Sequence, residues 1–480
     1  MSGAGYSERA GLPDGWEWAT LEQVAEVSGG IQKSPKRRPT QNHYPFLRVA
    51  NVARGSLDLS DVHRVELFEG ELERLRLQLG DLLVVEGNGS PDQIGRAAAW
   101  RGAIDNCVHQ NHLIRVRPTA GLSWRYLELA WNSPVVSDQL LSVAQSSSGL
   151  YTLSTGKLKR VLLPIPPLAE QERIVEALDA QLSRIDAAVT TSQRSRRKLE
   201  GLRKMIFRKF VPEEQPIGWR VVTVEEAGKV ELGRARHPDW HNGPEMRPYL
   251  RVANVFEDRI DTSDVMEMDF SGLFDKYKLH HGDVLLNEGQ SPHLVGRPAL
   301  YRGVPENVAF TNSILRFQAN EDVLPEWALM VFRRHLHAKR FMREVRITTN
   351  IAHLSAKRLK AVEFPIPPLH IQKQLVARCD ELLTGIAAVD AEAERSLRRA
   401  SALRNALLRK AFLGCLVPQD PGDEPAAAIL DRIRAERAAQ SKPKRTRPRK
   451  APAPRKAAAT VPAPEPTETP RTSTQQELPL

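Results

Sequence analysis

Two stretches of this 480-residue chain decide its architecture: "LPIPPLAEQERIV" at residues 163–175 and "FPIPPLHIQKQLV" at residues 364–376. Each places a Pro-Pro pair in front of a run with apolar residues at helical spacing. Proline fixes its own φ and disfavours helix in the residue before it, so the pair predicts a stiff lead into a helix. One such lead-in is ordinary, but a second copy indicates a repeat.

The repetition extends far beyond the prolines. Trp16 and Trp219 lie in matching stretches 203 residues apart, and "YPFLRVANV" is answered by "RPYLRVANV" at the same separation. "GDLLVVEGNGSPDQIGRAAAWRG" matches "GDVLLNEGQSPHLVGRPALYRG", and from Asn111 and Asn312 onward the separation is 201 residues. The chain is therefore a tandem duplication over nearly all of residues 10–415.

Each repeat divides into a globular part and a long helix. Short apolar runs such as "FLRVANV" and "DLLVVEG", separated by Gly, Asn, Asp and Pro, predict strands and turns, and a helical segment follows them. After the prolines the period changes to a heptad stripe, with Leu178, Ile185 and Leu199 in the first copy and Cys379, Ile386 and Leu407 in the second.

The heptad runs predict helices over about residues 168–210 and 369–413, with Gly414 as a C-cap residue. At 1.5 Å per residue each is about 60 Å long. A helix of that length with one apolar stripe needs a partner, so we predict that the two form an antiparallel coiled coil. The alternative is that each helix lies on its own globule.

The expected fold class is α+β, with two mixed α/β globules separated by the two helices. We expect a first globule at residues 1–162, a junction and helix at 163–211, a second globule at 212–363 and a junction and helix at 364–418. Residues 419–480 follow as a basic, Pro-rich tail with few large apolar residues, for which we predict disorder.

Composition narrows the class of protein. No run approaches the roughly 18 apolar residues needed to span a bilayer, and the first residues lack the apolar centre of a secretory signal, so we expect a cytoplasmic protein without membrane contact. The three cysteines, Cys107, Cys379 and Cys415, are not spaced for a disulfide or a metal site. Residues 1–418 contain 57 Lys and Arg against 50 Asp and Glu, and residues 419–480 contain 12 against 8. This excess is compatible with nucleic-acid binding, and the basic run of the tail either contacts DNA phosphates or keeps the protein in solution.

Motifs of catalysis are missing from the sequence. "SSSGLYTLSTGK" lacks the glycine spacing of a phosphate-binding loop, and no stretch resembles the S-adenosylmethionine motifs of amino-methyltransferases. No Ser/His/Asp or paired-carboxylate arrangement stands out. The residues alone therefore predict a protein that is not an enzyme.

The globule, the "PIPPLxEQxxIV" junction, the long helix and the repetition of all three resemble the specificity subunit of Type I restriction-modification systems. The resemblance covers about residues 12–415. It implies two target-recognition domains that each bind half of a split, asymmetric site on double-stranded DNA. It also implies a helical ruler between them and two methyltransferase subunits, with restriction or translocase subunits as further possible partners. Methylation, and the S-adenosylmethionine cofactor, would then belong to the partners, with no cofactor or metal in this chain. One departure is His370 and Ile371 in place of Ala169 and Glu170 at the second junction.

The duplication helps to choose candidate DNA-binding residues, because residues identical in both globules cannot distinguish two half-sites. Arg48 and Asn51, matched by Arg251 and Asn254, are therefore predicted to be scaffold or phosphate contacts. The candidates that differ between the copies, with those of the segments before each junction, are Lys33, Lys36, Arg37, Arg38, Asn88, Ser90, Gln93, Tyr151 and Lys157 in the first globule, and Arg234, Arg236, His237, Gln290, Ser291, His293 and Lys357 in the second. Each has the alternative of being an ordinary solvated loop residue.

Three functional hypotheses follow. The first is a DNA specificity subunit that positions methyltransferases on a two-part site. The second is a stand-alone DNA-binding regulator with two different reading domains, and the third is a coiled-coil scaffold without a role on DNA. An adjacent methyltransferase gene would favour the first over the second.

Overall fold

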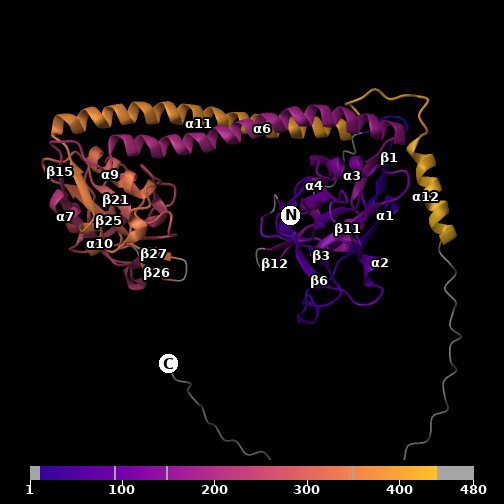
Figure 1. Ribbon diagram of the computed structural model, residues 1–480, viewed down its shortest axis with the longest axis horizontal. Coiled ribbons are helices and arrows are strands. Elements are labelled where there is room, and N and C mark those ends of the chain that lie inside the picture. The colour runs from indigo at the N-terminus through magenta and orange to yellow at the C-terminus, as the bar shows by residue number, and fades with distance from the viewer. Residues whose placement is uncertain (1–10, 91–92, 148–149, 345, 349–350, 441–480) are drawn as a thin grey trace, which may run out of the picture.

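The computed structural model describes residues 11–90, 93–147, 150–344, 346–348 and 351–440. Two globules lie on the same side of a long pair of helices, one near each end (Figure 1). The pair consists of α6 (Leu168–Phe210) and α11 (Leu369–Phe412). Both helices begin directly after the Pro-Pro pair, at the residues expected from the sequence, and their 43 and 44 residues correspond to about 65 Å.

The two globules contain equivalent strands in the same order, and one helix of globule 2 stands where globule 1 has two. The helices of globule 1 are α1 (Leu21–Val24), α2 (Glu71–Leu75), α3 (Trp124–Trp131), α4 (Pro134–Val143) and α5 (Thr155–Lys159). Its strands are β1 (Glu17–Thr20), β2 (Ala25–Gly29), β3 (His43–Leu47), β4 (Val52–Ala53), β5 (Ser56–Leu57), β6 (His63–Glu66), β7 (Leu82–Val85), β8 (Gly87–Asn88), β9 (Ala97–Ala99), β10 (Val108–His109), β11 (Leu113–Pro118), β12 (Gln145–Ser147), β13 (Leu150–Thr152) and β14 (Leu162–Ile165). The helices of globule 2 are α7 (Val224–Ala227), α8 (Phe274–Tyr277), α9 (Pro325–His337) and α10 (Ala356–Lys360). Its strands are β15 (Arg220–Thr223), β16 (Gly228–Leu232), β17 (Met246–Leu250), β18 (Val255–Phe256), β19 (Arg259–Ile260), β20 (Met266–Asp269), β21 (Val284–Asn287), β22 (Gly289–Gln290), β23 (Pro298–Leu300), β24 (Ala309–Phe310), β25 (Ile314–Ala319), β26 (Arg346–Thr348), β27 (Ile351–His353) and β28 (Glu363–Ile366).

A four-stranded antiparallel sheet forms the centre of each globule, with the order β2-β11-β7-β9 in the first and β16-β25-β21-β23 in the second. Every residue of β7, Leu82–Val85, is buried, which explains why this strand reads as a continuous apolar run rather than an alternating one. The matching β21 is buried in the same way. The sheet order is therefore a duplicated feature, as the repeat predicts.

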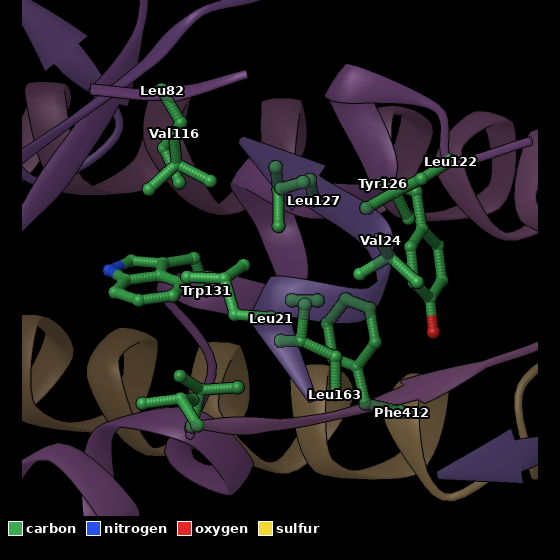
Figure 2. Packing of buried hydrophobic residues seen from close by; sticks show 14 of the residues in the cluster. Leu21, Val24, Leu82, Val116, Leu122, Tyr126, Leu127, Trp131, Leu163 and Phe412 are labelled. Atoms are coloured by element: carbon green, nitrogen blue, oxygen red, sulfur yellow. The ribbon is translucent and has the colours of Figure 1, made fainter. Parts of the chain in front are cut away.

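Each globule packs against one end of both long helices. The core of globule 1 includes Leu178 from the first half of α6 and Phe412 from the end of α11. Figure 2 shows Phe412 among side chains of globule 1, and its ring lies 5.3 Å from that of Tyr126 in an edge-on arrangement. Globule 2 reverses this pattern, because its core takes Phe207 from the end of α6 and Cys379 from the first half of α11. The two halves of the molecule are thus related by an approximate two-fold axis.

Contacts along the helix pair confirm its antiparallel direction. Asp186 pairs with Arg404, the Ser192 and Ser396 hydroxyl oxygens lie 3.3 Å apart, and Arg196 Nε donates to Asp390 at 2.9 Å. The predicted heptad stripe is buried, as at Leu199 and Ile386. Other apolar side chains of the pair remain exposed, because two helices alone cover only a narrow seam. Four apolar side chains of the pair are 46–65% exposed: Leu202, Met205, Val389 and Leu403.

The junctions after the Pro-Pro pairs are held by one buried glutamine in each copy. The Gln171 side chain accepts from the Ser123 N–H at 2.8 Å and donates to the Gly121 and Pro166 carbonyl oxygens at 3.1 and 3.2 Å. Gln372 repeats all three bonds, with the Leu324 N–H and the Asp322 and Pro367 carbonyl oxygens, each at 2.8 Å. The substitutions beside it, His370 and Ile371, therefore leave this contact intact.

Replacing either glutamine by alanine is expected to destabilise its globule by about 3 kcal/mol, because buried backbone groups lose their partners. Gln171→Ala and Gln372→Ala have similar predicted effects, measurable as a lowered midpoint of thermal or denaturant unfolding. The exposed neighbour Glu172 provides the control, since Glu172→Ala is expected to change stability by less than about 0.5 kcal/mol. A loss below 1 kcal/mol for both glutamine variants would contradict this role.

The prediction of a disordered tail from residue 419 is wrong for residues 419–440. These residues contain the helix α12 (Ala426–Gln440), which packs on globule 1 on the side away from globule 2 (Figure 1). Ala426, Ile429, Leu430 and Ile433 are only 0–4% exposed and join the core of globule 1. The composition was misleading because the few large apolar residues of this 15-residue helix lie next to a long low-complexity segment. Residues 441–480 lie outside the described part of the chain.

The segment before α12 explains the difference between the two junctions. Glu170, which is 1% exposed, accepts hydrogen bonds from Trp16 Nε1 at 2.9 Å and Gln419 Nε2 at 3.2 Å. Arg173 pairs with Asp423 at 2.6 Å. Burial raises the pKa of Glu170, and the two hydrogen bonds oppose that rise. Globule 2 has Ile371 at the position of Glu170. We call residues 413–440 the C-terminal strap.

Candidate nucleic-acid interface

A small three-stranded sheet brings together two segments that the sequence singled out separately. In globule 1 it has the order β12-β13-β8, and in globule 2 the order is β22-β27-β26. The Gly-rich loop supplies β8 or β22, and the segment before the junction supplies the hairpin β12–β13 or β26–β27. We call this element the hairpin sheet. Figure 1 shows that the hairpins lie on the sides of the globules that face one another.

The hairpin sheet of globule 1 places Tyr151 directly opposite Asn88. Tyr151 is half-buried and packs against the core of the globule. Ser90 and Gln93 are exposed in the loop that follows β8. Lys157 lies on the short helix α5 after the hairpin, where its N–H donates to the capping hydroxyl of Ser154. The structure thus brings five of the candidates of globule 1 to one region.

The same register in globule 2 carries different side chains. Gln290 lies opposite Ala352, so an amide residue is kept while the tyrosine becomes alanine. Gln290 Oε1 accepts from the Ser291 N–H at 3.1 Å, and His293 is exposed in the following loop. Lys357 is exposed on α10, the counterpart of α5. Two equivalent surfaces with different chemistry are what two different half-sites require.

The second cluster of candidates in globule 1 forms a basic hollow of about 330 Å³ between the loop after β2 and strand β6. Its lining includes Lys33, Arg37, Arg38, His63 and Arg64. Lys36 is exposed on the adjacent 3-10 helix η1 (Pro35–Arg37). Arg64 was not expected from the sequence, because it comes from a strand 26 or more residues away from the other basic side chains.

Arg37 has a structural partner within this hollow. Its guanidinium makes two hydrogen bonds of 2.8 Å to the Glu71 carboxylate and lies 4.6 Å from the Phe68 ring. These hydrogen bonds lower the pKa of Glu71 to about 2. A bidentate pair of this kind fixes the loop rather than leaving the guanidinium for DNA. Lys33, Lys36 and Arg38 are exposed and remain candidates for phosphate contact.

The matching loop of globule 2 divides in the same way. Arg234 is only 8% exposed, donates to the Asp269 carbonyl oxygen and lies 4.2 Å from the Trp240 ring. It therefore holds the loop and does not present its guanidinium at the surface. Arg236 and His237 are exposed beside it, and His237 Nδ1 lies 3.2 Å from the Asp239 carboxylate.

The residues shared by both copies form a scaffold turn, one of the two roles predicted for them. The Asn51 side chain accepts from the Arg48 N–H at 2.8 Å and donates to the Asp58 and Asp61 carbonyl oxygens, both at 2.9 Å. Asn254 makes the same three bonds in globule 2, with the Arg251 N–H and the Asp261 and Asp264 carbonyl oxygens.

Sequence reasoning missed a carboxylate–histidine pair beside each hairpin sheet. His112 Nδ1 lies 2.9 Å from Glu86 in globule 1, and His353 Nδ1 lies 3.2 Å from Glu288 in globule 2. The two glutamates are equivalent, but their histidines come from different elements. The two glutamates could have been predicted, because they are identical at matching positions of the repeat. The two histidines could not, because they occupy positions that do not match.

Comparison with known proteins agrees with this geometry. Residues 13–194 and 216–392 each match the family described as type I restriction modification DNA specificity domain. The chain is 23% identical over 459 residues to the type I restriction enzyme EcoKI specificity subunit of Escherichia coli K12, covering 91% of this chain and 98% of that protein. It is 23% identical over 464 residues to the StySPI specificity subunit of Salmonella potsdam, covering 92% and 99%. A chain from a solved structure on assembly and conformational transition of the type I R-M system has the same fold, with a TM-score of 0.62, 18% identity and coverage of 84% and 99%.

The duplicated globules, the antiparallel spacer and the paired surfaces define a two-headed DNA-recognition protein. The chain belongs to the type I restriction-modification DNA specificity family, whose domain it contains twice. Among the described residues, no helix is both long and apolar enough to cross a membrane.

Proposed function

We propose that this chain reads a bipartite, asymmetric DNA site for a type I restriction-modification system, with one half-site per globule and the helix pair setting the distance between them. The observation that carries this proposal is the pairing of equal folds with unequal surfaces at the two ends of one spacer. Chemistry on the DNA belongs to partner subunits in this scheme, and the role of this chain is recognition.

The hairpin sheets and their loops are the proposed base-reading elements. Asparagine and glutamine form two hydrogen bonds with adenine, so an amide at the position shared by Asn88 and Gln290 suits a common element of the two half-sites. Tyr151, whose counterpart in globule 2 is Ala352, supplies one difference between the two surfaces, and Gln93 and His293 of the loops that follow supply another. Ser90 and Ser291 are the same residue in both loops.

Phosphate contacts are proposed for the remaining basic candidates of the two globules. Lys33, Lys36 and Arg38 at the basic hollow, and Arg236 in the matching loop, are exposed. His237 is exposed beside Arg236, with its Nδ1 3.2 Å from the Asp239 carboxylate. Lys157 and Lys357 on the short helices complete the set. Lysine acts mainly as a point charge on phosphate oxygen, which positions the duplex without reading its sequence.

Two methyltransferase subunits are the proposed partners of the helix pair. Leu202, Met205, Val389 and Leu403 leave apolar surface on the helices, and exposed apolar groups on a two-helix spacer favour covering by a further protein. Because the two halves of the pair are related by an approximate two-fold axis, one subunit in each half is the arrangement that the symmetry favours.

Sequencing of modified bases in DNA from cells that carry this chain and its methyltransferase tests the proposal. We expect a single modified motif with two short unlike specified parts separated by unspecified bases. A continuous motif would contradict the two-headed reading. The absence of any motif that depends on this chain would contradict the assignment to recognition.

A further inference from the structure

Each globule places one glutamate at the point where the central sheet joins the hairpin sheet. Glu86 lies between β7 and β8, and Glu288 lies between β21 and β22. The Glu86 N–H donates to the His112 carbonyl oxygen at 3.0 Å, and the Glu86 carbonyl oxygen accepts from the Leu153 N–H at 2.8 Å. The Glu288 backbone makes the two equivalent bonds, at 2.9 and 2.8 Å. The backbone therefore holds both glutamates at matching places beside the proposed reading surfaces.

The histidine that pairs with each glutamate comes from a different part of the repeat. His112 precedes β11, and Ser313 stands at the matching position of globule 2. His353 belongs to β27, and Thr152 stands at the matching position of globule 1. Two unrelated positions thus bring the same side chain to the same carboxylate. A pair that is built by two routes indicates that the pair itself has a role.

Both glutamate side chains reach the surface, with Glu86 35% and Glu288 22% exposed. Each histidine Nδ1 contacts the Oε2 oxygen of its glutamate. The contrast is Glu71, where Arg37 bonds both carboxylate oxygens and fixes a loop. Because a carboxylate has about four lone-pair sites, a single histidine contact leaves it able to accept further hydrogen bonds.

The carboxylate–histidine pair presents hydrogen-bond acceptors. The histidine nitrogen that faces the carboxylate carries the proton, since two acceptors would repel each other, and Nε2 of a neutral ring is then an acceptor too. On the major-groove edges of bases, the hydrogen-bond donors are the cytosine N4 and adenine N6 amino groups. Guanine O6 and thymine O4 are acceptors, which a carboxylate repels. The pair therefore suits a base that carries an exocyclic amino group.

We propose that Glu86 and Glu288 each accept a hydrogen bond from the exocyclic amino group of one base, cytosine N4 or adenine N6, in the half-site of their globule. This inference rests on the proposed function, because it names one contact within each reading surface. The paired histidines are positioning residues that orient the carboxylates. A carboxylate close to DNA is repelled by the phosphates, and a hydrogen bond from a base amino group offsets that cost. Since the glutamates are identical, this contact is common to both half-sites.

The test measures binding of the full chain, with its methyltransferase, to duplexes of the motif that it modifies. Each duplex lacks one amino group, with purine in place of one adenine or pyrimidin-2-one in place of one cytosine, which also distinguishes the two bases. Removal of a contacted amino group is expected to weaken binding about 10-fold. Glu86→Ala is expected to abolish this sensitivity at one position of the first half-site, and Glu288→Ala at one position of the second.

Three further variants separate base contact from structural support. Glu86→Gln keeps an acceptor for His112 and loses only the charge, so we expect a smaller sensitivity at the same base. His112→Ala is expected to reduce that sensitivity, and His112→Asn, whose amide donor can replace Nδ1, to restore it. Glu69→Ala, at an exposed glutamate outside the hairpin sheet, is expected to leave every position unchanged.

Unchanged sensitivities in both glutamate-to-alanine variants would overturn the inference and leave the pairs as fasteners of the hairpin sheet. Lost sensitivity in both half-sites from a single variant would also overturn it. Failure of the unaltered chain to bind its motif more tightly than other DNA would instead show that the proposed function has failed.

Discussion

A chain in which residues 219–362 are replaced by a second copy of residues 16–161 is expected to direct its methyltransferase partner to an inverted repeat of the first half-site. Both globules then carry the hairpin sheet of globule 1, with Tyr151 opposite Asn88. Because the helix pair is antiparallel, and each globule packs on the start of one helix and the end of the other, the copies face DNA related by a two-fold axis. Two identical readers in that relation require identical half-sites on opposite strands.

Globule 2 is the better one to replace, since the C-terminal strap covers only globule 1. A different globule at the first position would place another residue where Gly121 now contacts Ile429 of the strap. Sequencing of modified bases provides the measurement, and the unaltered chain provides the reference motif. Retention of the original second half-site, or a direct repeat of the first, would contradict the assignment of one half-site to each globule.

Insertion of seven residues into both long helices, at the contact between Ser192 and Ser396, is expected to lengthen the unspecified spacer while leaving both half-sites unchanged. Insertions after Ser192 and after Ser396 keep the two helices in register, because these residues face one another. Seven helical residues add about 10 Å, equivalent to at most about three base pairs at 3.4 Å each. The heptad keeps the buried stripe on the same side of each helix.

An insertion into α6 alone supplies the matched control. It displaces Arg196 from Asp390 and Glu394 and moves one helix end away from its globule, so we expect loss of binding rather than a longer spacer. An unchanged spacer in the double insertion would contradict the ruler. A changed half-site would contradict the separation between reading and spacing.

Most of the fold could be predicted from the sequence because each local pattern occurs twice. The Pro-Pro pairs located the first residue of both long helices, since backbone restriction by proline acts locally. The identical Arg-Val-Ala-Asn turns were predicted to be either scaffold or phosphate contacts, and their hydrogen bonds show the scaffold role. The roles of side chains that depend on a distant partner could not be predicted from the sequence. Arg37 pairs with Glu71, and Arg234 donates to the carbonyl oxygen of Asp269, 35 residues later. The helix α12 was missed because its burial depends on Gly121, about 300 residues earlier.

The strap also joins the two extremities of the folded chain. Gly414, with φ +74°, lies against Pro13, and the Ala426 N–H donates to the Gly15 carbonyl oxygen at 2.9 Å. The chain runs from globule 1 through α6, globule 2 and α11 and returns to globule 1, so its first and last described segments lie in contact. A circularly permuted chain, opened between α6 and globule 2 and closed through the strap, would retain every contact that sets the distance between the two reading surfaces.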